Sequence, residues 1–437
     1  MLGAPVFRTA LFVPWPGNAL WTAARAVPSL DLPFADSKSL VDAITGRQLI
    51  SFARAGSGTY TDSAGVLQTA ATDVPRFDHN PLTGESLGLL VEEQRTNLKT
   101  YSDAILSVNG YAAVNATLAT ITTATPTGSA TASLFTMNAG ANTGNNTDGF
   151  NFGSATTLAN STQHTQSLFV KPAGATVLRL RSNVGGTLFD FTLTGNGTAP
   201  SPSLDLQTAS IVAFANGWYR VSWTFTTTTS APGNRGDYWT IKTNVADGTN
   251  GVYVVGAQLE AGATASSYIP TTTAAATRNA DVAQITGTNF SSWYRQDEGT
   301  LFCDALGLGA GVPVSDFQSL ATFSDGTNAT RIELGYLSAS SAYWNLRSAG
   351  SSSVEISPTV SAARRLLAAS YSSALAEISV NGAAALSDSS VTVPLVNKLD
   401  IGGANGAAIK EFNGHIRRLT FWPQRLDNAT IQSLSQP

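Results

Sequence analysis

The sequence is short of charged residues, cysteine and lysine, and each shortage excludes a class of function. Only 12% of the 437 residues are charged, roughly half the share of an ordinary soluble domain, so the surface has to be mostly uncharged and polar. With a net charge of −4 and six lysines, the chain lacks the basic surface that nucleic-acid binding requires. A single cysteine, Cys303, excludes an internal disulfide framework and a multi-cysteine zinc site.

Long apolar runs are missing as well. No stretch of about 18 apolar residues occurs, so no membrane-spanning helix is expected. The apolar opening of the chain has no Lys or Arg ahead of it and is broken by Pro14, Pro16 and Gly17, so no signal peptide is expected. Hydrophobic residues still make up 43% of the chain, which is enough for packed cores and excludes wholesale disorder.

Short strands separated by turns are indicated along the whole chain. Glycine (39) and proline (18) occur throughout, and the spacing typical of amphipathic helices is almost absent. Residues 219–225 and 189–193 alternate apolar and polar side chains, as half-buried strands do, whereas 251–259 is apolar on both phases, as a central strand is. These patterns predict an all-β protein with antiparallel β-sandwiches.

Four segments follow from these patterns, and no repeat of fixed period joins them. Residues 1–30 hold four prolines and too many apolar residues for a free tail, and they are predicted to form an extended arm. Residues 31–102 are predicted to form a β-hairpin connector, 103–280 the first sandwich and 281–437 the second.

The predicted arm would expose Leu11, Phe12, Trp15 and Trp21 to water unless something covers them, at about 25 cal/mol per Å². A neighbouring subunit or another protein is one cover, which makes these residues the candidates for anchoring. The alternative is that the arm folds back on its own chain. The sequence leaves both open.

Local details of the second sandwich are also predicted. Ile416, Leu419 and Phe421 can all point inward only if a β-bulge lies near Arg417 and Arg418. Asn381-Gly382 favours a tight type I′ turn, because both residues tolerate positive φ. Either Asp427 or Asn428 is expected to cap a short terminal helix.

Three parts of the chain resemble known families. The stretch VPRFDHNPLTGESLGLLVEEQRTN resembles a module that recurs in tailed-bacteriophage virion proteins just after an N-terminal segment. QSLFVKP, NGWYRVSWTF and VYVVGAQLEAGATASSYIPT resemble the jelly-roll, carbohydrate-binding-module-like domain of phage tail and fibre proteins. LDIGGANGAAIKEFNGHIRRLTFWPQRLDNATIQSLSQ resembles the end of a concanavalin A-like or laminin G-like jelly roll.

The resemblances imply a place on the surface of a tailed-phage particle, as a tail fibre, spike or head-decoration protein made in the host cytoplasm. The N-terminal part would dock on virion proteins of the portal, adaptor, tail or capsid. The sandwiches would project outward and adsorb to host-surface polysaccharide. Such fibres are usually homotrimers, and a low charge with many Ser and Thr suits subunits packed side by side. Neither nucleic acid nor insertion into a membrane is expected.

Few residues are candidates for catalysis. Hydrolysis of a glycan usually needs two carboxyl groups roughly 5–9.5 Å apart. Glu92–Glu93 and Asp297–Glu298 are adjacent pairs whose side chains would point to opposite faces of a strand, and solvated charges explain them better. No catalytic residue is expected. A purely structural decoration protein is the first alternative to glycan binding, and a glycan depolymerase is the second.

The histidines and the cysteine do not indicate an active site either. His79, His164 and His415 are scattered, and the chain has no G-x-S-x-G motif, so a catalytic triad is not expected. Cys303 lies in phase with the apolar residues of its strand and is expected to be buried and inert.

Sugar binding is the functional candidate that remains. A pyranose ring packs its C–H face on an exposed aromatic ring while polar groups bond its hydroxyls. Trp218, Tyr238 and Tyr343 are the aromatic residues predicted to face outward and bind carbohydrate, and the alternative is that they complete the cores. No cofactor is expected, and only bound calcium is left open. Both resembled jelly-roll families often hold calcium through loop carboxylates and backbone carbonyls, and Asp325 lies in such a loop, where the alternative is a solvated turn residue.

Overall fold

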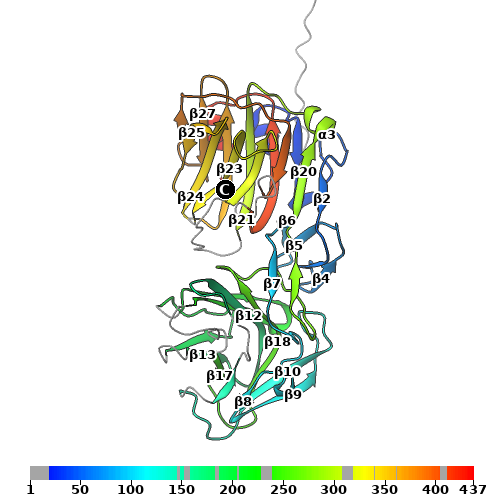
Figure 1. Ribbon diagram of the computed structural model, residues 1–437, viewed down its shortest axis with the longest axis vertical. Coiled ribbons are helices and arrows are strands. Elements are labelled where there is room, and N and C mark those ends of the chain that lie inside the picture. The colour runs from blue at the N-terminus through cyan, green and yellow to red at the C-terminus, as the bar shows by residue number, and fades with distance from the viewer. Residues whose placement is uncertain are drawn as a thin grey trace, which may run out of the picture.

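Two β-sandwiches follow one another along the long axis of the molecule (Figure 1), and the prediction of an all-β protein with antiparallel sandwiches is confirmed. Within the described residues no helix has the length and apolar character to cross a membrane. The computed structural model describes residues 19–144, 148–151, 158–182, 187–203, 206–227, 239–307, 318–338, 340–360, 362–403 and 411–437.

The first sandwich lies at the bottom of Figure 1. Its strands are β8 (Ala113–Val114), β9 (Ala116–Thr122), β10 (Thr131–Met137), β11 (Gly149–Asn151), β12 (Gln163–Ala173), β13 (Val177–Ser182), β14 (Leu188–Thr192), β15 (Thr208–Ala213), β16 (Tyr219–Thr226), β17 (Trp239–Thr243) and β18 (Gly251–Ala261). They form a six-stranded sheet, β15-β16-β12-β18-β10-β9, and a five-stranded sheet, β14-β13-β17-β11-β8. Between these sheets lies one apolar core.

The alternation seen in the sequence places this core. Tyr219, Val221 and Trp223 of β16 point into it, as do Phe189 and Phe191 of β14. The all-apolar strand β18 lies between β12 and β10, which confirms its predicted central position. A period of two therefore predicted which face of each strand is buried.

The second sandwich takes strands from both ends of the chain. Its N-terminal strands are β1 (Leu30–Leu32), β2 (Ser51–Ala53), β5 (Arg76–His79) and β6 (Ser86–Val91). The others are β20 (Val282–Thr286), β21 (Gly299–Gly307), β22 (Gln318–Ser324), β23 (Arg331–Ser338), β24 (Ser341–Ser348), β25 (Ser351–Ile356), β26 (Arg364–Tyr371), β27 (Ala376–Val380), β28 (Leu386–Asp388), β29 (Lys398–Ile401) and β30 (Gly414–Trp422). One sheet has the order β28-β27-β26-β21-β30-β6-β5, with β1 also paired to β30, and the other has the order β2-β20-β29-β22-β23-β24-β25.

The core of the second sandwich lies between these two sheets. Phe323 of β22 and Trp344 of β24 meet Leu301 of β21 and Phe421 of β30 there. Cys303 is fully buried in the same core, where burial raises the pKa of its thiol well above the usual value. The expectation of a buried, unreactive cysteine is confirmed.

The first sandwich is inserted into the second. The chain leaves the second sandwich through β7 (Arg95–Asn97) and returns through β19 (Ala276–Arg278), and these two strands pair antiparallel. The segment 31–102 is therefore not a separate connector, because four of its strands complete the sheets of the second sandwich. The segment does form hairpins, one from β5 and β6 and the other from β3 (Gly58–Thr61) and β4 (Leu67–Ala70). Hairpin signals are local and do not say which distant strand a hairpin joins.

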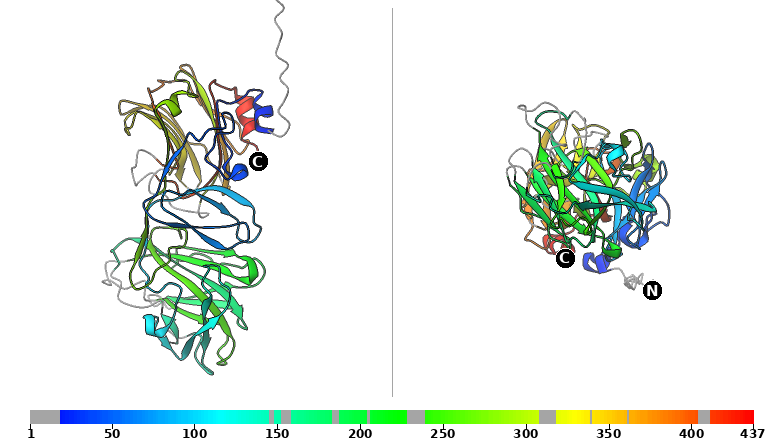
Figure 2. Two further views of the ribbon diagram at one scale, coloured as in Figure 1. Left: turned by 90° about the vertical axis from the view of Figure 1, so that its right-hand side faces the viewer. Right: turned by 90° about the horizontal axis from the view of Figure 1, so that it is seen from below.

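Residues 19–30 do not form an extended arm. The helix α1 (Ala19–Ala24) packs beside the terminal helix α4 (Asn428–Leu434), as Figure 2 shows, and β1 follows it onto β30. The indole nitrogen of Trp422 donates to the carbonyl of Ala26 at 3.1 Å. The chain thus covers this apolar stretch with its own sheet, which is the alternative that the sequence left open.

One anchoring candidate lies inside this fold-back and three lie outside the described residues. Trp21 is half-buried in α1, and its Nε1 donates to Asp31 Oδ2 at 3.1 Å. For Trp21 the structure thus shows the fold-back that the sequence left open, because the indole packs and bonds within its own chain. Leu11, Phe12 and Trp15 precede the described residues, so their predicted anchoring role stays a prediction.

The predicted bulge and helix cap are both present. Asp304 lies opposite Arg418 and Ala305 opposite Ile416, which leaves Arg417 as the extra residue of β30. The Asp427 side chain accepts the backbone N–H of Thr430 at 2.8 Å and so caps α4.

The Asn381-Gly382 turn also forms. Asn381 and Gly382 both adopt positive φ, and the N–H of Ala383 donates to the carbonyl of Val380, as in a type I′ turn. Two short helices complete the fold, α2 (Phe34–Ser37) and α3 (Gly287–Ser291).

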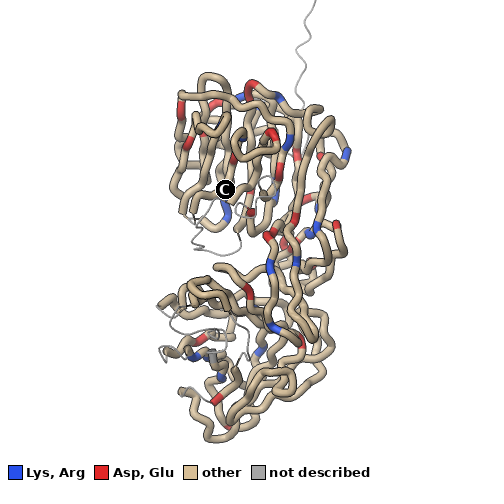
Figure 3. Tube along the Cα trace, in the orientation of Figure 1, with Lys and Arg blue, Asp and Glu red and all other residues tan. Residues whose placement is uncertain are grey.

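Charged residues are sparse along the trace, and a group of them lies where the two sandwiches meet (Figure 3). We name Arg54, Arg76, Glu92, Arg278 and Asp281 the junction cluster. Arg54 Nη1 lies 3.1 Å from Asp281 Oδ1, and Arg76 Nη1 lies 2.7 Å from Glu92 Oε2. Arg76 also contacts Asp281, and Arg278 Nε lies 3.4 Å from Glu92. All five side chains are at most 1% exposed.

Glu92 is therefore not the solvated charge that the sequence suggested. Burial by itself would raise the pKa of Glu92, but the charges of Arg278 and Arg76 outweigh it and hold the pKa well below its usual range. Glu93, the next residue, pairs with Arg95 and keeps 26% of its side chain exposed. The two neighbours consequently serve as test and control.

Replacing Glu92 by Gln should lower the free energy of unfolding by about 3–5 kcal/mol, because Arg278 would stay buried without its counter-charge and Arg76 would keep only Asp281. Glu93→Gln should lower it by less than about 1 kcal/mol, because its ion pair is partly exposed. Urea denaturation followed by tryptophan fluorescence measures both variants. Equal losses in the two variants would contradict the role given to the junction cluster.

Candidate functional site

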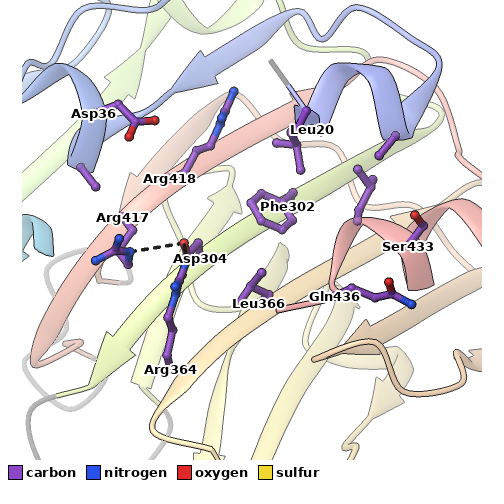
Figure 4. A pocket seen from close by; sticks show the side chains of 14 residues that line it. Leu20, Asp36, Phe302, Asp304, Arg364, Leu366, Arg417, Arg418, Ser433 and Gln436 are labelled. Atoms are coloured by element: carbon purple, nitrogen blue, oxygen red, sulfur yellow. Dashed lines mark hydrogen bonds and ion pairs between the residues drawn. The ribbon is translucent and has the colours of Figure 1, made fainter. Parts of the chain in front are cut away.

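Two surfaces of the second sandwich have the side chains that a ligand site needs. The first is a hollow of about 400 Å³ between α1, α4 and the strands β21, β26 and β30, which we name the terminal groove (Figure 4). Leu20, Phe302 and Leu366 form its apolar floor, and Arg364 and Asp304 lie at one side.

The charged groups of the terminal groove bind one another. Arg364 donates to both carboxylate oxygens of Asp304, at 2.9 and 2.6 Å. Arg418 donates to Asp31 at 2.9 and 2.6 Å, and Arg417 donates to a carboxylate oxygen of Glu85 at 2.9 Å. Phe302 is only 3% exposed, so its ring does not present a stacking face. The terminal groove therefore has an apolar floor, and Asp304, Arg364, Arg417 and Arg418 are engaged in ion pairs.

The second surface is a line of polar side chains across the other sheet. We name Gln284, Asp400, Thr322, Glu333 and Asn345 the polar row. Each faces the next across the ladder, from β20 through β29, β22 and β23 to β24. Their sequence neighbours point into the core between the sheets, so the row lies on the opposite face of this sheet.

A line of basic residues runs beside the polar row. Each of them lies on the same strand as a member of the polar row and two residues away from it. Lys398 Nζ lies 2.9 Å from Asp400 Oδ1, and Arg331 Nε donates to Glu333 Oε2 at 2.6 Å. Arg347 lies opposite Arg331 and donates to the carbonyl of Gly350 at 2.9 and 2.6 Å. We name Lys398, Arg331 and Arg347 the basic row.

Two polar atoms of the polar row are left open. Thr322 Oγ1 and Asn345 Oδ1 are buried and have no hydrogen-bond partner in the described part of the chain. The Asn345 amide is oriented by its nitrogen, which donates to the carbonyl of Val354 at 2.7 Å and to Ser352 Oγ at 3.1 Å. We name Thr322 Oγ1 and Asn345 Oδ1 the open pair.

The open pair was missed by reasoning from the sequence. Polar residues on the non-core phase of successive strands were visible, but ordinary solvent-facing strands show the same pattern. What distinguishes the row is burial, since Thr322, Glu333 and Asn345 are fully buried on a face that is not the core. Burial on that face follows from tertiary packing, which strand periodicity does not report.

The predicted carbohydrate-binding aromatics lie in different places. Trp218 is 2% exposed and donates from Nε1 to the carbonyl of Ala124 at 3.2 Å, so the expectation that it faces outward is wrong. Its sheet is covered on the polar phase too, by a second apolar cluster that contains Phe169 and Tyr268. Tyr238 lies outside the described residues.

Tyr343 lies on the same face as the polar row but is not exposed. It is on β24, two residues from Asn345, and only 3% of it is exposed. Burial raises the pKa of its hydroxyl above the usual value. Tyr343 can border the polar row, but a buried ring is not a stacking platform, so the expected exposure is wrong.

The other candidates have structural roles. His79 and His164 each contact a backbone carbonyl at 3.1 Å, and His415 Nε2 contacts Asp78 at 2.8 Å. Asp325 accepts from the backbone and hydroxyl of Thr327, its own turn. In the part of the chain that the structure describes, no three His, Cys, Asp or Glu side chains gather as a metal site would require.

No protein-family model and no curated protein matches the chain. Part of it is similar to the CBM40 domain of the Ruminococcus gnavus IT-sialidase, solved with α2,3 sialyllactose, at 14% identity and a TM-score of 0.27 over 33% of this chain and 84% of that one. The SAP-like pentraxin of Limulus polyphemus is similar at 12% identity and a TM-score of 0.26, over 32% and 70%. The NanB sialidase of Streptococcus pneumoniae is similar at 14% identity and a TM-score of 0.28, over 35% and 26%.

Replacing Thr322 by Val should raise the free energy of unfolding by about 1 kcal/mol, because it removes a buried hydroxyl that has no partner and keeps the side chain's shape. The matched control is Thr300→Val. The buried Thr300 hydroxyl donates to the carbonyl of Gln424 and accepts from Leu426, both at 2.8 Å, so the control should lose about 1–3 kcal/mol. Denaturation curves that show a similar loss for both variants would mean that Thr322 has a partner after all.

Proposed function

We propose that this protein binds glycans at the polar row and does so on the surface of a tailed-phage particle. One observation carries the glycan part: the open pair, which lies among carboxylate, amide and hydroxyl groups on a face outside the core. A buried polar atom without a partner costs about 1–3 kcal/mol, so a chain that keeps two of them on one face, two strands apart, gains by a ligand that bonds both.

The dimensions of the row suit a short oligosaccharide. From Asp400 to Asn345 it crosses three strand spacings of about 4.8 Å each, or about 14 Å in all. The middle of the row is buried, whereas Glu355 on the adjoining strand β25 is exposed and Gln284 at the other end is half-buried. A sugar chain would therefore contact the row at its ends, and the side chains that cover Thr322 and Asn345 would have to move for it to reach the open pair.

Thr322→Val should weaken glycan binding at least about fivefold, because a sugar hydroxyl would lose a partner worth roughly 1 kcal/mol. The measurement is binding of the full chain to immobilised purified bacterial surface polysaccharides, with Thr300→Val as the control for a buried threonine elsewhere. Since Thr322→Val is expected to be more stable than the wild type, weaker binding cannot come from unfolding. Unchanged binding would mean that the row only packs.

The virion part of the proposal is supported by the sequence resemblance over residues 50–100 and by the way that the N-terminal part is anchored. Through α1 and β1 the chain is fixed to the second sandwich before the first hairpin begins. A virion protein that binds residues 1–18 would therefore be connected directly to a sheet of the second sandwich. The terminal groove adjoins the point where these residues join α1, since Ala19 and Leu20 line it.

Deleting residues 1–18 should abolish incorporation into phage particles while the circular dichroism spectrum stays unchanged. The deletion must stop there, because β1, β2, β5 and β6 follow and belong to the second sandwich. The truncated and the full chain would be expressed in an infected host that lacks the gene, and purified particles would be probed for the protein. Incorporation at the full-length level would contradict docking by this segment.

Light scattering of the full chain should give the mass of a homotrimer, and a lone monomer would contradict the predicted trimer.

A further inference from the structure

We infer that the polar row takes an uncharged, polyhydroxylated sugar and rejects anionic sugars such as uronates. The inference rests on the proposed glycan binding and names the class of ligand. It follows from three features of the same face: the state of its basic groups, the kind of atoms that are open, and the position of its carboxylates.

The basic row is engaged within the protein. Arg331 pairs with Glu333 and also contacts the carbonyl of Asn328, while Lys398 pairs with Asp400. Arg347 turns its guanidinium to the carbonyl of Gly350 in its own hairpin. Recognition of a ligand carboxylate usually uses a guanidinium that offers two parallel N–H groups. To bind one here, Arg331 or Lys398 would first have to leave a carboxylate that is almost fully buried.

The open pair favours a ligand that supplies hydrogen-bond donors. Asn345 Oδ1 is an acceptor only, and its assignment is fixed because the carbonyl of Val354 can accept but not donate and so requires the amide nitrogen. Thr322 Oγ1 can donate or accept. A sugar hydroxyl or the N–H of an acetamido group can donate to Asn345 Oδ1. An ionised carboxylate cannot, because it carries acceptors only.

The carboxylates of the row flank the open pair. Glu333 lies between Thr322 and Asn345 in the ladder, and Asp400 lies on the other side of Thr322. An anionic group placed on the open pair would thus face two carboxylates at the distance of neighbouring strands, in a buried setting where like charges repel strongly. Neutral hydroxyls meet no such penalty and can donate to these same oxygens.

A matched pair of probes tests this directly. Galactose and galacturonic acid oligomers of equal length differ at C6, where one has a hydroxymethyl group and the other a carboxylate. The wild-type chain should bind the galactose oligomer, or the neutral member of the equivalent mannose and glucose pairs, at least about tenfold more tightly. Its affinity should change less than about twofold between 0.05 and 0.5 M NaCl, because no charge pair forms.

The variant Glu333→Gln should bind the uronate oligomer more tightly than the wild type does. The substitution removes the central negative charge and frees the guanidinium of Arg331 for a ligand, so affinity for the uronate oligomer should rise about tenfold. Because Glu333 belongs to the polar row, the neutral oligomer should bind no more tightly than before, so the readout is the ratio of the two affinities, and the circular dichroism spectrum checks that the variant is folded. Glu355→Gln, at the exposed end of the same ladder, is the matched control and should leave both affinities within about twofold.

The outcomes separate the two claims. If the wild type binds uronates as tightly as their neutral partners, or if Glu333→Gln does not improve uronate binding, the inference fails while glycan binding stands. If no oligomer and no polysaccharide binds the wild type, the proposed function fails and the inference with it.

Discussion

The pairing of β6 with β30 joins the two ends of the chain, and the rest of the architecture depends on it. It places strands from the N-terminal part inside the second sandwich and thereby makes the first sandwich an insertion, which the chain enters through β7 and leaves through β19 and which the β3–β4 hairpin also contacts through Thr59 and Leu67. At the base of β7 and β19 the junction cluster replaces apolar packing with buried ion pairs. Such pairs tolerate the loss of a partner poorly, so they favour one fixed arrangement of the crossing strands.

Burial of polar groups takes two opposite forms in this molecule. In the junction cluster the opposite charges meet at close range, and the two carboxylates each contact two arginines. In the polar row the charges are also paired, but a hydroxyl and an amide oxygen are left open on the face that the core does not use. Guanidinium nitrogens of Arg76 and Arg278 in the junction cluster also lack a hydrogen-bond partner, so the open pair differs from the cluster in being uncharged and in lying on a face outside the core.

Much of the fold was predictable, because strand alternation, turns, caps and bulges are determined by neighbouring residues. The Asp427 cap and the bulge at Arg417 are examples. What failed depends on distant packing. Trp218 was predicted to face solvent because it lies in phase with the polar residues of the strand that follows it. A second apolar cluster, however, covers that face of the sheet. Glu92 appeared to be a surface charge until residues near 278 and 281 were brought beside it. For the same reason the open pair could not be identified, since a threonine and an asparagine on a strand carry no sign of what covers them.

A crystal structure with a neutral oligosaccharide bound is the most direct test of glycan recognition at the polar row. We expect one sugar hydroxyl within hydrogen-bonding distance of Thr322 Oγ1 and another within hydrogen-bonding distance of Asn345 Oδ1, with the Arg331–Glu333 pair intact. Sugar seated in the terminal groove, or anywhere else while the polar row stays closed, would contradict it.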